Sequence, residues 1–444
     1  MRSIRPRRVC LATMAIGAMT ILVAPVLGST SASVAATPSV AVPQPPPVAG
    51  LPANLGLASQ TVPKGLPPIK HVFVIMLENE SESATFASDP YLKTLETQGA
   101  YVPNYYGTGH LSNDNYVAMI SGQAPNPQNQ ADCQYYDDFV GLPPVVAGTG
   151  TPLDGQAVGA GCVYPSSVQT ISNQLTAKGL AWKGYMEDMG NVPSRESAVC
   201  GHPALNTQDG TQSAVAGDGY VSRHDPFVYF HNIIDASECD KVVPLGTATG
   251  SLPSSAPPGT TGLVTNLKSE STTPNLSFIV PNVCDDGHDY PCTNEPTPTS
   301  ATCATIHETA GAVCDIDLWL RVWVPIITHS PAYKDGGLLL VTFDEANFPG
   351  DVQASDYSAV PADTSSCCNE MPGPDSPLPG IAGMGGGKVG LVALSRFIKP
   401  GTVSAVSYNH YALLGSIEDL FGLSRLGFAA DVPNTFGSDI YTNP

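Results

Sequence analysis

Ile69-Lys-His-Val-Phe-Val-Ile-Met-Leu-Glu-Asn79 is the stretch that decides the fold, and it follows Pro67 and Pro68. Its short apolar run, rich in β-branched residues, predicts a buried strand of an α/β sheet. The run ends abruptly at Glu78 and Asn79. Because chemistry collects beyond the carboxyl ends of the strands in open α/β sheets, both are candidate functional residues. For this strand alone, the alternative that they only cap the next turn stays open.

Strand-like and helix-like segments alternate along the rest of the chain. Strands are predicted at 69–77, 181–187, 276–281, 337–343 and 388–394. Helices are predicted at 91–98, 113–121, 166–178, 315–328 and 410–421. This alternation predicts an α/β fold with a doubly wound, mainly parallel sheet and helices on both faces.

Three predicted strands end in acidic clusters. The first ends at Glu78, the strand 276–281 runs into Asn282-Val-Cys-Asp-Asp-Gly-His-Asp289, and the strand 337–343 runs into Asp344 and Glu345. One edge of a parallel sheet would gather these groups, which repel one another unless a cation neutralises them. We therefore expect a divalent metal ion there. The alternative is a set of independent loop acids on a solvated edge.

Two further segments carry candidate residues at predicted helix N-termini. Gly107-Thr-Gly-His-Leu-Ser-Asn-Asp-Asn-Tyr116 places Ser112 before a short helix closed by Gly122, where the hydroxyl and the following N–H groups would face an anion. Ser112 as an ordinary N-cap and His110 as a satisfied loop histidine remain alternatives. His410 begins the last predicted helix, either as a second-metal ligand or as a cap.

The N-terminus has the features of an export signal. Residues 1–36 contain four arginines, an apolar stretch from Val9 to Leu27 and the small-residue sequence Val34-Ala-Ala36. We predict a signal peptide over 1–36, a flexible Pro/Ala-rich segment over 37–66 and a single catalytic domain over 67–444. Arg7-Arg8 also loosely fits a twin-arginine signal. The mature protein is therefore expected to be secreted.

The amino-acid composition restricts which classes of partner the protein can bind. Loss of the four arginines would take the formal net charge from −20 to −24. So acidic a surface repels nucleic acid and anionic bilayers, which disfavours nucleic-acid binding and stable membrane association. Of the 11 cysteines, Cys10 leaves with the signal. The remaining even set of ten predicts up to five disulfides of unspecified connectivity, which would staple long loops rather than bind metal. Long surface loops are predicted at 141–161, 244–274 and 349–387 from their Gly and Pro content.

Taken in order, these motifs resemble the phosphoesterase family of bacterial phospholipases C and secreted acid phosphatases, within the alkaline phosphatase superfamily. The resemblance spans residues 69–422, and its motifs are Val74-Ile-Met-Leu-Glu-Asn79, His110-Leu-Ser-Asn-Asp-Asn-Tyr116 with Ser121-Gly122, Val280-Pro-Asn-Val-Cys-Asp-Asp-Gly-His-Asp289, Thr342-Phe-Asp-Glu345, and Asn409-His-Tyr-Ala-Leu-Leu414 with Ile417-Glu-Asp-Leu-Phe-Gly422.

The resemblance implies an alkaline-phosphatase-like fold and a role for each matching residue. Ser112 would be the nucleophile of a phosphoseryl mechanism, with His110 or His288 protonating the leaving group. The metal, which could be Ca, Zn, Mg or Fe, would be held by Glu78, Asn79, Asp344 and Glu345. Asp286, Asp289 and His410 would bind phosphate or a second metal.

Two departures from the family pattern bear on these roles. Glu80-Ser-Glu-Ser-Ala-Thr-Phe86 stands where the family often has Arg-Ser-Phe-Asp, and Glu345 stands where the family has Asp or His. Glu345 is therefore the least secure of the expected ligands.

We predict a phosphomonoesterase of the acid-phosphatase type acting on a small phosphate ester. The absence of appended C-terminal β-domains, which the larger phospholipases C of the family carry, favours this subgroup. A phospholipase C that releases a lipid headgroup is the alternative. A non-catalytic metal-binding protein on the same fold is a remoter one, because such a protein has no need of a nucleophile.

Overall fold

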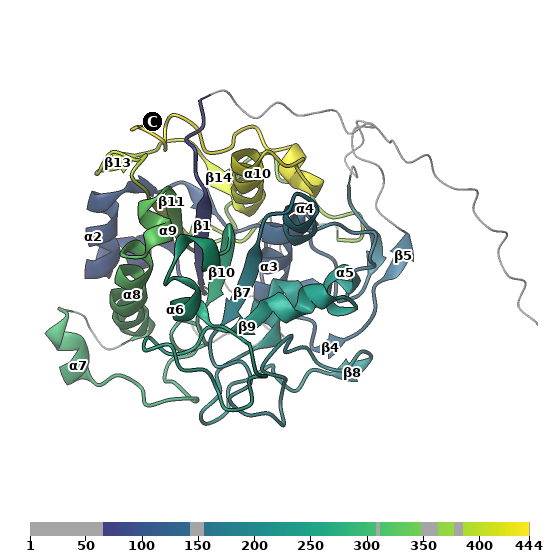
Figure 1. The fold of residues 1–444 in the computed structure, drawn as a ribbon. Coiled ribbons are helices and arrows are strands. Elements are labelled where there is room, and N and C mark those ends of the chain that lie inside the picture. The colour runs from purple at the N-terminus through teal and green to yellow at the C-terminus, as the bar shows by residue number, and fades with distance from the viewer. Residues whose placement is uncertain (1–64, 143–154, 308–310, 348–362, 377–384, 444) are drawn as a thin grey trace, which may run out of the picture. The chain divides into compact units, whose positions relative to one another are not determined.

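The structure is a computed structural model that describes residues 65–142, 155–307, 311–347, 363–376 and 385–443. An eight-stranded sheet with the order β13-β2-β12-β11-β1-β10-β7-β9 forms its centre (Figure 1). In chain order, these strands are β1 (His71–Leu77), β2 (Ala100–Val102), β7 (Trp182–Met186), β9 (Val242–Pro244), β10 (Leu276–Val280), β11 (Gly337–Phe343), β12 (Leu391–Leu394) and β13 (Thr402–Val403).

The sheet is mainly parallel, as predicted. β1 pairs in parallel with β10 and β11, and β7 does so with β10 and β9. β12 differs because it runs antiparallel to both β11 and β2. Soon after β11 ends, the Ala346 N–H donates to the Gly386 carbonyl at 2.8 Å. The residues just before β12 therefore lie beside the C-terminal end of β11, and β12 runs back along it.

Helices cover both faces of the sheet (Figure 1). α2 packs on α8, and α3 packs on α10 and α4. The helices are α1 (Glu82–Ser88), α2 (Pro90–Gln98), α3 (Ser112–Ser121), α4 (Ile171–Ala177), α5 (His231–Ile234), α6 (Leu263–Asn266), α7 (Ser300–Thr305), α8 (Ala312–Thr328), α9 (Pro331–Lys334) and α10 (His410–Phe421). The doubly wound α/β prediction is confirmed.

Several element boundaries differ from the sequence expectation. The helix expected over 166–178 begins only at Ile171, because Thr170 forms a capping box with Asn173. The short strands β2, β9 and β13 were not predicted, because two or three residues in a strand carry no readable period. The seven-residue helix α1 was also missed.

The expected long loops also contain some regular structure. β5 (Val140–Leu142) and β6 (Val158–Ala160) pair across the loop expected at 141–161. Small two-stranded sheets join β3 (Tyr105–Tyr106) to β14 (Tyr408–Asn409) and β4 (Tyr135–Tyr136) to β8 (Thr207–Gln208). Much of the loop expected at 349–387 lies outside the described residues, as do the expected signal peptide and nearly all of the 37–66 segment.

Register between β1 and its neighbours positions the candidate site. Every residue of β1 and β11 is buried, and Leu77 pairs with Phe343. Glu78 and Asp344 are therefore the next residues on two adjacent parallel strands. On the other side of β1, the Glu78 N–H donates to the Asp286 carbonyl at 2.9 Å, which brings in the turn after β10.

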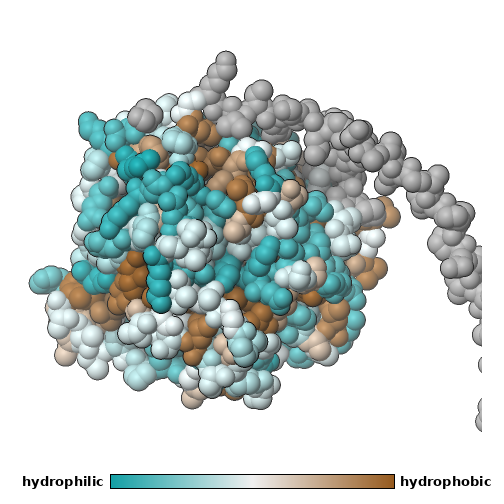
Figure 2. Space-filling view, viewed as in Figure 1, coloured by the Kyte–Doolittle hydropathy of each residue, from teal (hydrophilic) through white to brown (hydrophobic). Residues whose placement is uncertain are grey.

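The surface gives two observations relevant to membranes. Among the described helices, none is long and apolar enough to cross a bilayer. On the face drawn in Figure 2, apolar residues lie in small groups among hydrophilic ones.

Ten cysteines pair at bonding distance and lie outside the strands. The pairs are Cys133–Cys162, Cys200–Cys239, Cys284–Cys292, Cys303–Cys314 and Cys367–Cys368. Five disulfides are typical of proteins from an oxidising compartment.

Titration of thiols in the purified, denatured and non-reduced mature protein should therefore find none free. After reduction, limited proteolysis is expected to cut first in the cysteine-bearing loops, because the disulfides constrain those segments and not the sheet. The unreduced protein is the matched control. Several free thiols before reduction would contradict the prediction.

Candidate active site

Glu78 and Asp344 form the centre of the site. Both side chains are fully buried, and the Asp344 Oδ1 accepts hydrogen bonds from the Asn79 N–H at 3.0 Å and the Glu345 N–H at 2.6 Å. Its second oxygen, Oδ2, has no hydrogen-bond partner among the described residues. Burial, followed by the charges of Asp344 and Asp286, raises the pKa of Glu78 well above its ordinary value.

Ser112 lies against this pair. It is the first residue of α3, with Leu111 at the N-cap, so the alternative in which Ser112 serves as the N-cap is wrong. Its Oγ instead donates to Glu78 Oε2 at 3.3 Å, and the residue is buried. A serine hydroxyl held against a buried carboxylate is an arrangement that can be activated for attack.

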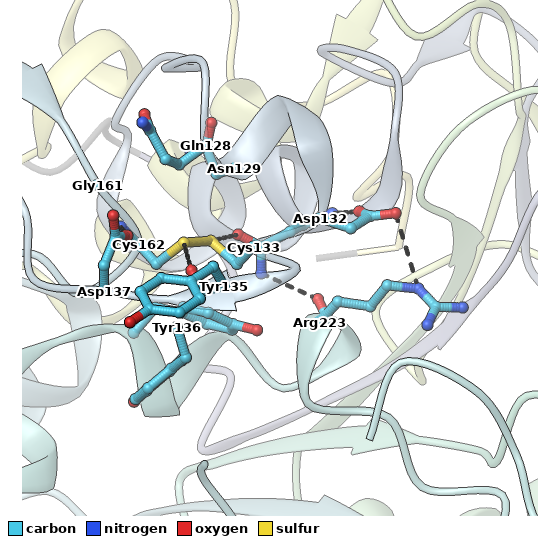
Figure 3. Close-up of a disulfide and its surroundings, with 12 residues drawn as sticks. Gln128, Asn129, Asp132, Cys133, Tyr135, Tyr136, Asp137, Gly161, Cys162 and Arg223 are labelled. Carbon is cyan, nitrogen blue, oxygen red and sulfur yellow. Dashed lines mark hydrogen bonds and ion pairs between the residues drawn. A yellow bond between two sulfur atoms is a disulfide. The ribbon is translucent and has the colours of Figure 1, made fainter. Parts of the chain in front are cut away.

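The backbone N–H of Asn113, the residue after Ser112, was expected to face an anion such as phosphate, but it has a partner within the protein. Asn113 donates its N–H to Asp132 Oδ1 at 3.0 Å, so a protein carboxylate takes the place expected for a phosphoryl oxygen. Asp132 also lies 3.8 Å from the Nε of Arg223 (Figure 3). It directly precedes Cys133, so the Cys133–Cys162 disulfide fixes its loop beside the site.

Arg223 and His224 are functional candidates that the sequence analysis missed. His224 bridges two buried carboxylates, with Nε2 2.9 Å from Glu78 Oε1 and Nδ1 3.1 Å from Asp286 Oδ2. Its ring stacks on that of Tyr116. The pair belongs to a 3-10 helix at Ser222–His224, and the compact Arg-His-Asp sequence before Pro226 was the available signal.

His288 and Asp289 lie at the rim of the site. His288 Nδ1 is 2.7 Å from Asp289 Oδ1, and its Nε2 is 3.1 Å from an Arg223 guanidinium nitrogen. The side chain is 27% exposed, so it is the more accessible of the two predicted proton donors. Ligand atoms of Glu78, His224 and His288 all lie within 4.8 Å of one another, which makes them a possible metal-binding group.

Glu345, the residue after Asp344, forms a buried pair with His110. Glu345 Oε2 contacts His110 Nδ1, and the other ring nitrogen lies 3.1 Å from the Asp363 carbonyl. Burial lowers the pKa of His110 to about 4. His110 is therefore less suited than His288 to donate a proton to a leaving group.

His410 contacts the backbone of the site. Its Nε2 is 2.5 Å from the Asp344 carbonyl oxygen, and its Nδ1 is 2.9 Å from the Tyr105 hydroxyl. The cap of α10 is Asn409, whose side chain accepts from the Ala412 N–H, so His410 is not the cap. With both nitrogens engaged, His410 is placed to position Asp344.

Negative charge dominates the site. Glu78, Asp286, Asp344 and Glu345 are buried together with Asp132. Their basic partners in the described chain are His224, which contacts Glu78 and Asp286, His110, which contacts Glu345, and Arg223, which pairs with Asp132. Burial lowers the pKa of both histidines, so Arg223 is the partner that stays positively charged. Burial raises the pKa of Asp344 to about 7 and that of Asp286 well above its ordinary value. Oxygen donors without a counter-charge, including the unpartnered Asp344 Oδ2, fit a divalent cation.

The raised pKa of Asp344 predicts a pH-dependent effect of metal on stability. Its folded value of about 7 exceeds the ordinary 3.8, so its contribution to stability is full below about 4 and is lost as the pH rises through about 7. We expect Tm of the metal-free protein to be lower at pH 8 than at pH 5, and Mg²⁺ or Ca²⁺ to raise Tm more at pH 8. Thermal unfolding with and without chelator measures this, and equal metal-induced shifts at both pH values would contradict it.

Comparisons with known proteins identify the family to which the chain belongs. The Phosphoesterase family profile matches residues 85–424. The chain is 24% identical to the Phosphatidylinositol-3-phosphatase of Mycobacterium tuberculosis (strain ATCC 25618 / H37Rv) over 92% of this chain and 91% of that protein. It is 25% identical to the Phosphate-repressible acid phosphatase of Penicillium chrysogenum over 80% of this chain, but spans only 59% of that protein.

Among solved structures, the chain is similar to a protein in the alkaline phosphatase superfamily from Vibrio parahaemolyticus. The TM-score is 0.42 at 12% identity, over 86% of this chain and 78% of the other. Because the family profile matches most of the chain, the chain belongs to the Phosphoesterase family and is a phosphoric ester hydrolase.

Proposed function

We propose that this protein is a secreted, metal-dependent phosphomonoesterase of the acid-phosphatase type that uses Ser112 as its nucleophile. The observation that carries the proposal is the Ser112 Oγ, 3.3 Å from Glu78 Oε2 inside a buried carboxylate cluster. The relatives carry the names phosphatidylinositol-3-phosphatase and phosphate-repressible acid phosphatase, which supports a phosphatase activity for this chain.

Glu78 and Asp344 are the first candidates to hold the cation, with Asn79, Glu345, His224 and His288 within the surrounding set. The fit rests on the unpartnered Asp344 Oδ2 and on the three ligand atoms grouped around Glu78. When bound, a divalent cation neutralises the carboxylates and lowers the pKa of the serine hydroxyl.

The chain's own residues account for the other requirements of phosphoryl transfer. Ser112 attacks phosphorus, its proton passes to Glu78, and a phosphoseryl intermediate forms as the ester oxygen leaves. Arg223 and Asn79 bind the equatorial oxygens as charge spreads over them. His288 at the rim gives a proton to the leaving oxygen. Water then attacks the phosphoserine as His288 takes a proton from it, and Glu78 returns its proton to the Ser112 oxygen as phosphate leaves.

Secretion and domain organisation complete the proposal. The five cysteine pairs are those of a protein that folds in an oxidising compartment, and the N-terminal sequence carries the features of an export signal. We assign residues 67–444 to a single catalytic domain, preceded by the signal peptide at 1–36 and the linker at 37–66.

One surface feature favours the alternative of a phospholipase C. Val140 and Leu142 are 77% and 66% exposed, and because they stand two residues apart on β5 they face the same side. An exposed apolar pair of this kind is suited to contact a lipid. The non-catalytic alternative is disfavoured by the contact of Ser112 with Glu78, since metal binding alone needs no serine there.

Substrate ranking tests the proposal. We expect kcat/KM to be higher for an aryl phosphate than for phosphatidylcholine vesicles, because a monoester offers three free oxygens to Arg223, Asn79 and the cation. Both substrates are assayed in one buffer with the same metal.

The variant Val140→Ser/Leu142→Ser is the matched control, because it removes the apolar pair and leaves the site unchanged. A higher kcat/KM for the lipid, lost in this variant, would replace the monoesterase assignment by the phospholipase C one.

A further inference from the structure

One side chain, that of Asn115, holds the loop that precedes the candidate nucleophile. Asn115 lies on α3, three positions after Ser112, and is fully buried. Its side-chain oxygen accepts hydrogen bonds from the Thr108 N–H at 2.7 Å, the Thr108 hydroxyl at 3.0 Å and the Gly109 N–H at 3.0 Å. Its side-chain nitrogen donates to the carbonyls of Gly109 and Leu111, each at 2.9 Å.

These contacts use the whole hydrogen-bonding capacity of the Asn115 amide. The two N–H bonds of the side-chain nitrogen have two acceptors, and the side-chain oxygen has three donors. Both polar atoms are therefore occupied within the protein. A buried polar group that is fully satisfied makes the segment that it binds rigid and specifies one arrangement of it. The contacts of Asn115 thus fix the backbone of the loop that leads into Ser112.

The loop that Asn115 fixes packs against the two residues that follow β11. A methyl group added to Gly107 would lie 2.5 Å from the Asp344 carbonyl oxygen, so the two backbones are in close contact. Further along the loop, His110 contacts the Glu345 carboxylate. The loop therefore meets the end of β11 at two points, and its shape is coupled to the position of Asp344.

The same loop sets the direction of the Ser112 side chain. Leu111 is the N-cap of α3, and Ser112 Oγ donates to Glu78 Oε2 at 3.3 Å. Because Asn115 binds the Leu111 carbonyl, it fixes the path by which the chain enters the helix, and with it the orientation of the serine. A displacement of about 1 Å at a reacting atom can lower a rate by ~100-fold.

We propose that Asn115 is a positioning residue of the reaction, which holds the Ser112 hydroxyl in register with Asp344 by clamping the loop between them. The inference rests on the proposed function, because it takes Ser112 as the nucleophile. The position of this oxygen affects the chemical step, whereas Arg223 and Asn79 bind the phosphoryl group. Loss of the clamp therefore lowers kcat and leaves phosphate binding unchanged.

Kinetics of the Asn115→Ala variant with an aryl phosphate test the proposal. We expect kcat to fall at least about a hundredfold, because all five hydrogen bonds to the loop are lost. The inhibition constant of inorganic phosphate should stay within about threefold of the parent value. Rapid acid quench should show phosphoserine forming more slowly, by the same factor as kcat.

Asn266→Ala is the matched control for that variant. Asn266 is buried on α6, and its side-chain oxygen accepts hydrogen bonds from the Tyr185 hydroxyl at 3.0 Å and from Lys183 and Thr261 at 3.3 Å each. The substitution should lower Tm, because it leaves buried polar groups without a partner, and should keep kcat at the parent value. An asparagine with a purely structural role behaves in this way.

A second variant, Asn115→Asp, makes the clamp depend on pH. An ionised carboxylate still accepts hydrogen bonds but donates none to the carbonyls of Gly109 and Leu111, whereas a protonated carboxyl donates one. Since burial favours the protonated form, kcat of Asn115→Asp relative to the parent should rise as the pH falls from about 8 to about 5. The same ratio for Asn115→Ala should stay constant, and circular dichroism at both pH values checks that each variant is folded.

The outcomes separate this role from the proposed function. Phosphoserine formed at the parent rate in Asn115→Ala, or an equal loss of kcat in Asn266→Ala, would overturn the role of Asn115 alone. If Asn115→Ala does not fold, the Asn115→Asp ratio decides, and a ratio that does not change with pH overturns the proposal. Full turnover by Ser112→Ala would overturn the proposed function and this inference together.

Discussion

Replacing Ser112 with alanine is expected to lower kcat/KM for an aryl phosphate by at least about a thousandfold, with the fold intact. The serine Oγ is 3.3 Å from Glu78 Oε2, and alanine leaves no oxygen to attack phosphorus. The loss should appear in kcat more than in KM, because Arg223 and Asn79 would still bind the phosphoryl group. Steady-state kinetics on the purified variant and its circular dichroism spectrum measure both points.

Ser121→Ala is the matched control because Ser121 is buried at the other end of α3 and donates to the Val117 carbonyl at 2.7 Å. It should keep near-normal turnover, and a phosphorylated residue should be trapped by rapid acid quench in the parent and in Ser121→Ala but not in Ser112→Ala. Near-normal turnover by Ser112→Ala would remove Ser112 from the mechanism.

Removing the cation is expected to have the second large effect. Treatment with chelator followed by gel filtration should reduce phosphate release by at least about a thousandfold, and divalent metal should restore it. The Asp344→Asn variant should lose activity to a similar extent and bind the metal less tightly. Asp344 is fully buried and offers an unpartnered oxygen, so the neutral amide removes charge from the centre of the site.

Asp335→Asn is the control for that variant. Asp344 follows the C-terminal end of β11, whereas Asp335 lies just before its N-terminal end, at the opposite end of the strand. Asp335 forms an exposed ion pair with Lys70 at 2.5 Å. Surface pairs contribute little to stability, so activity and metal affinity should stay unchanged. Full activity of the wild type after complete removal of metal would contradict metal dependence.

Local patterns determined the central features of the fold. Apolar runs in the sequence predicted the ends of β1, β7, β10 and β11 within one or two residues. A strand covered on both faces is apolar along its whole length, so it can be recognised from the sequence alone. The same patterns placed Glu78 and Asp344 at strand ends. Glu78 and Asp344 lie close together because β1 and β11 are adjacent parallel strands, as the pairing of Leu77 with Phe343 shows.

Other site residues depended on contacts that no local pattern encodes. His224 lies outside any strand end, yet folding brings it within 2.9 Å of Glu78, from which it is separated by nearly 150 residues. Asp132 reaches the N–H after Ser112 from a loop held by a disulfide whose partner is 29 residues away. Sequence spacing cannot specify such contacts, because loops have no period.

The sequence by itself determined the α/β class, the strands that deliver carboxylates and the serine that begins a helix, because periodicity and strand ends are local properties. Only the tertiary structure decided that Asp132 accepts the hydrogen bond of the N–H after Ser112, that His410 contacts the Asp344 backbone and that His224 contacts Asp286. Those outcomes depend on which way each loop side chain turns once it is buried, and burial is set by the packing of distant segments.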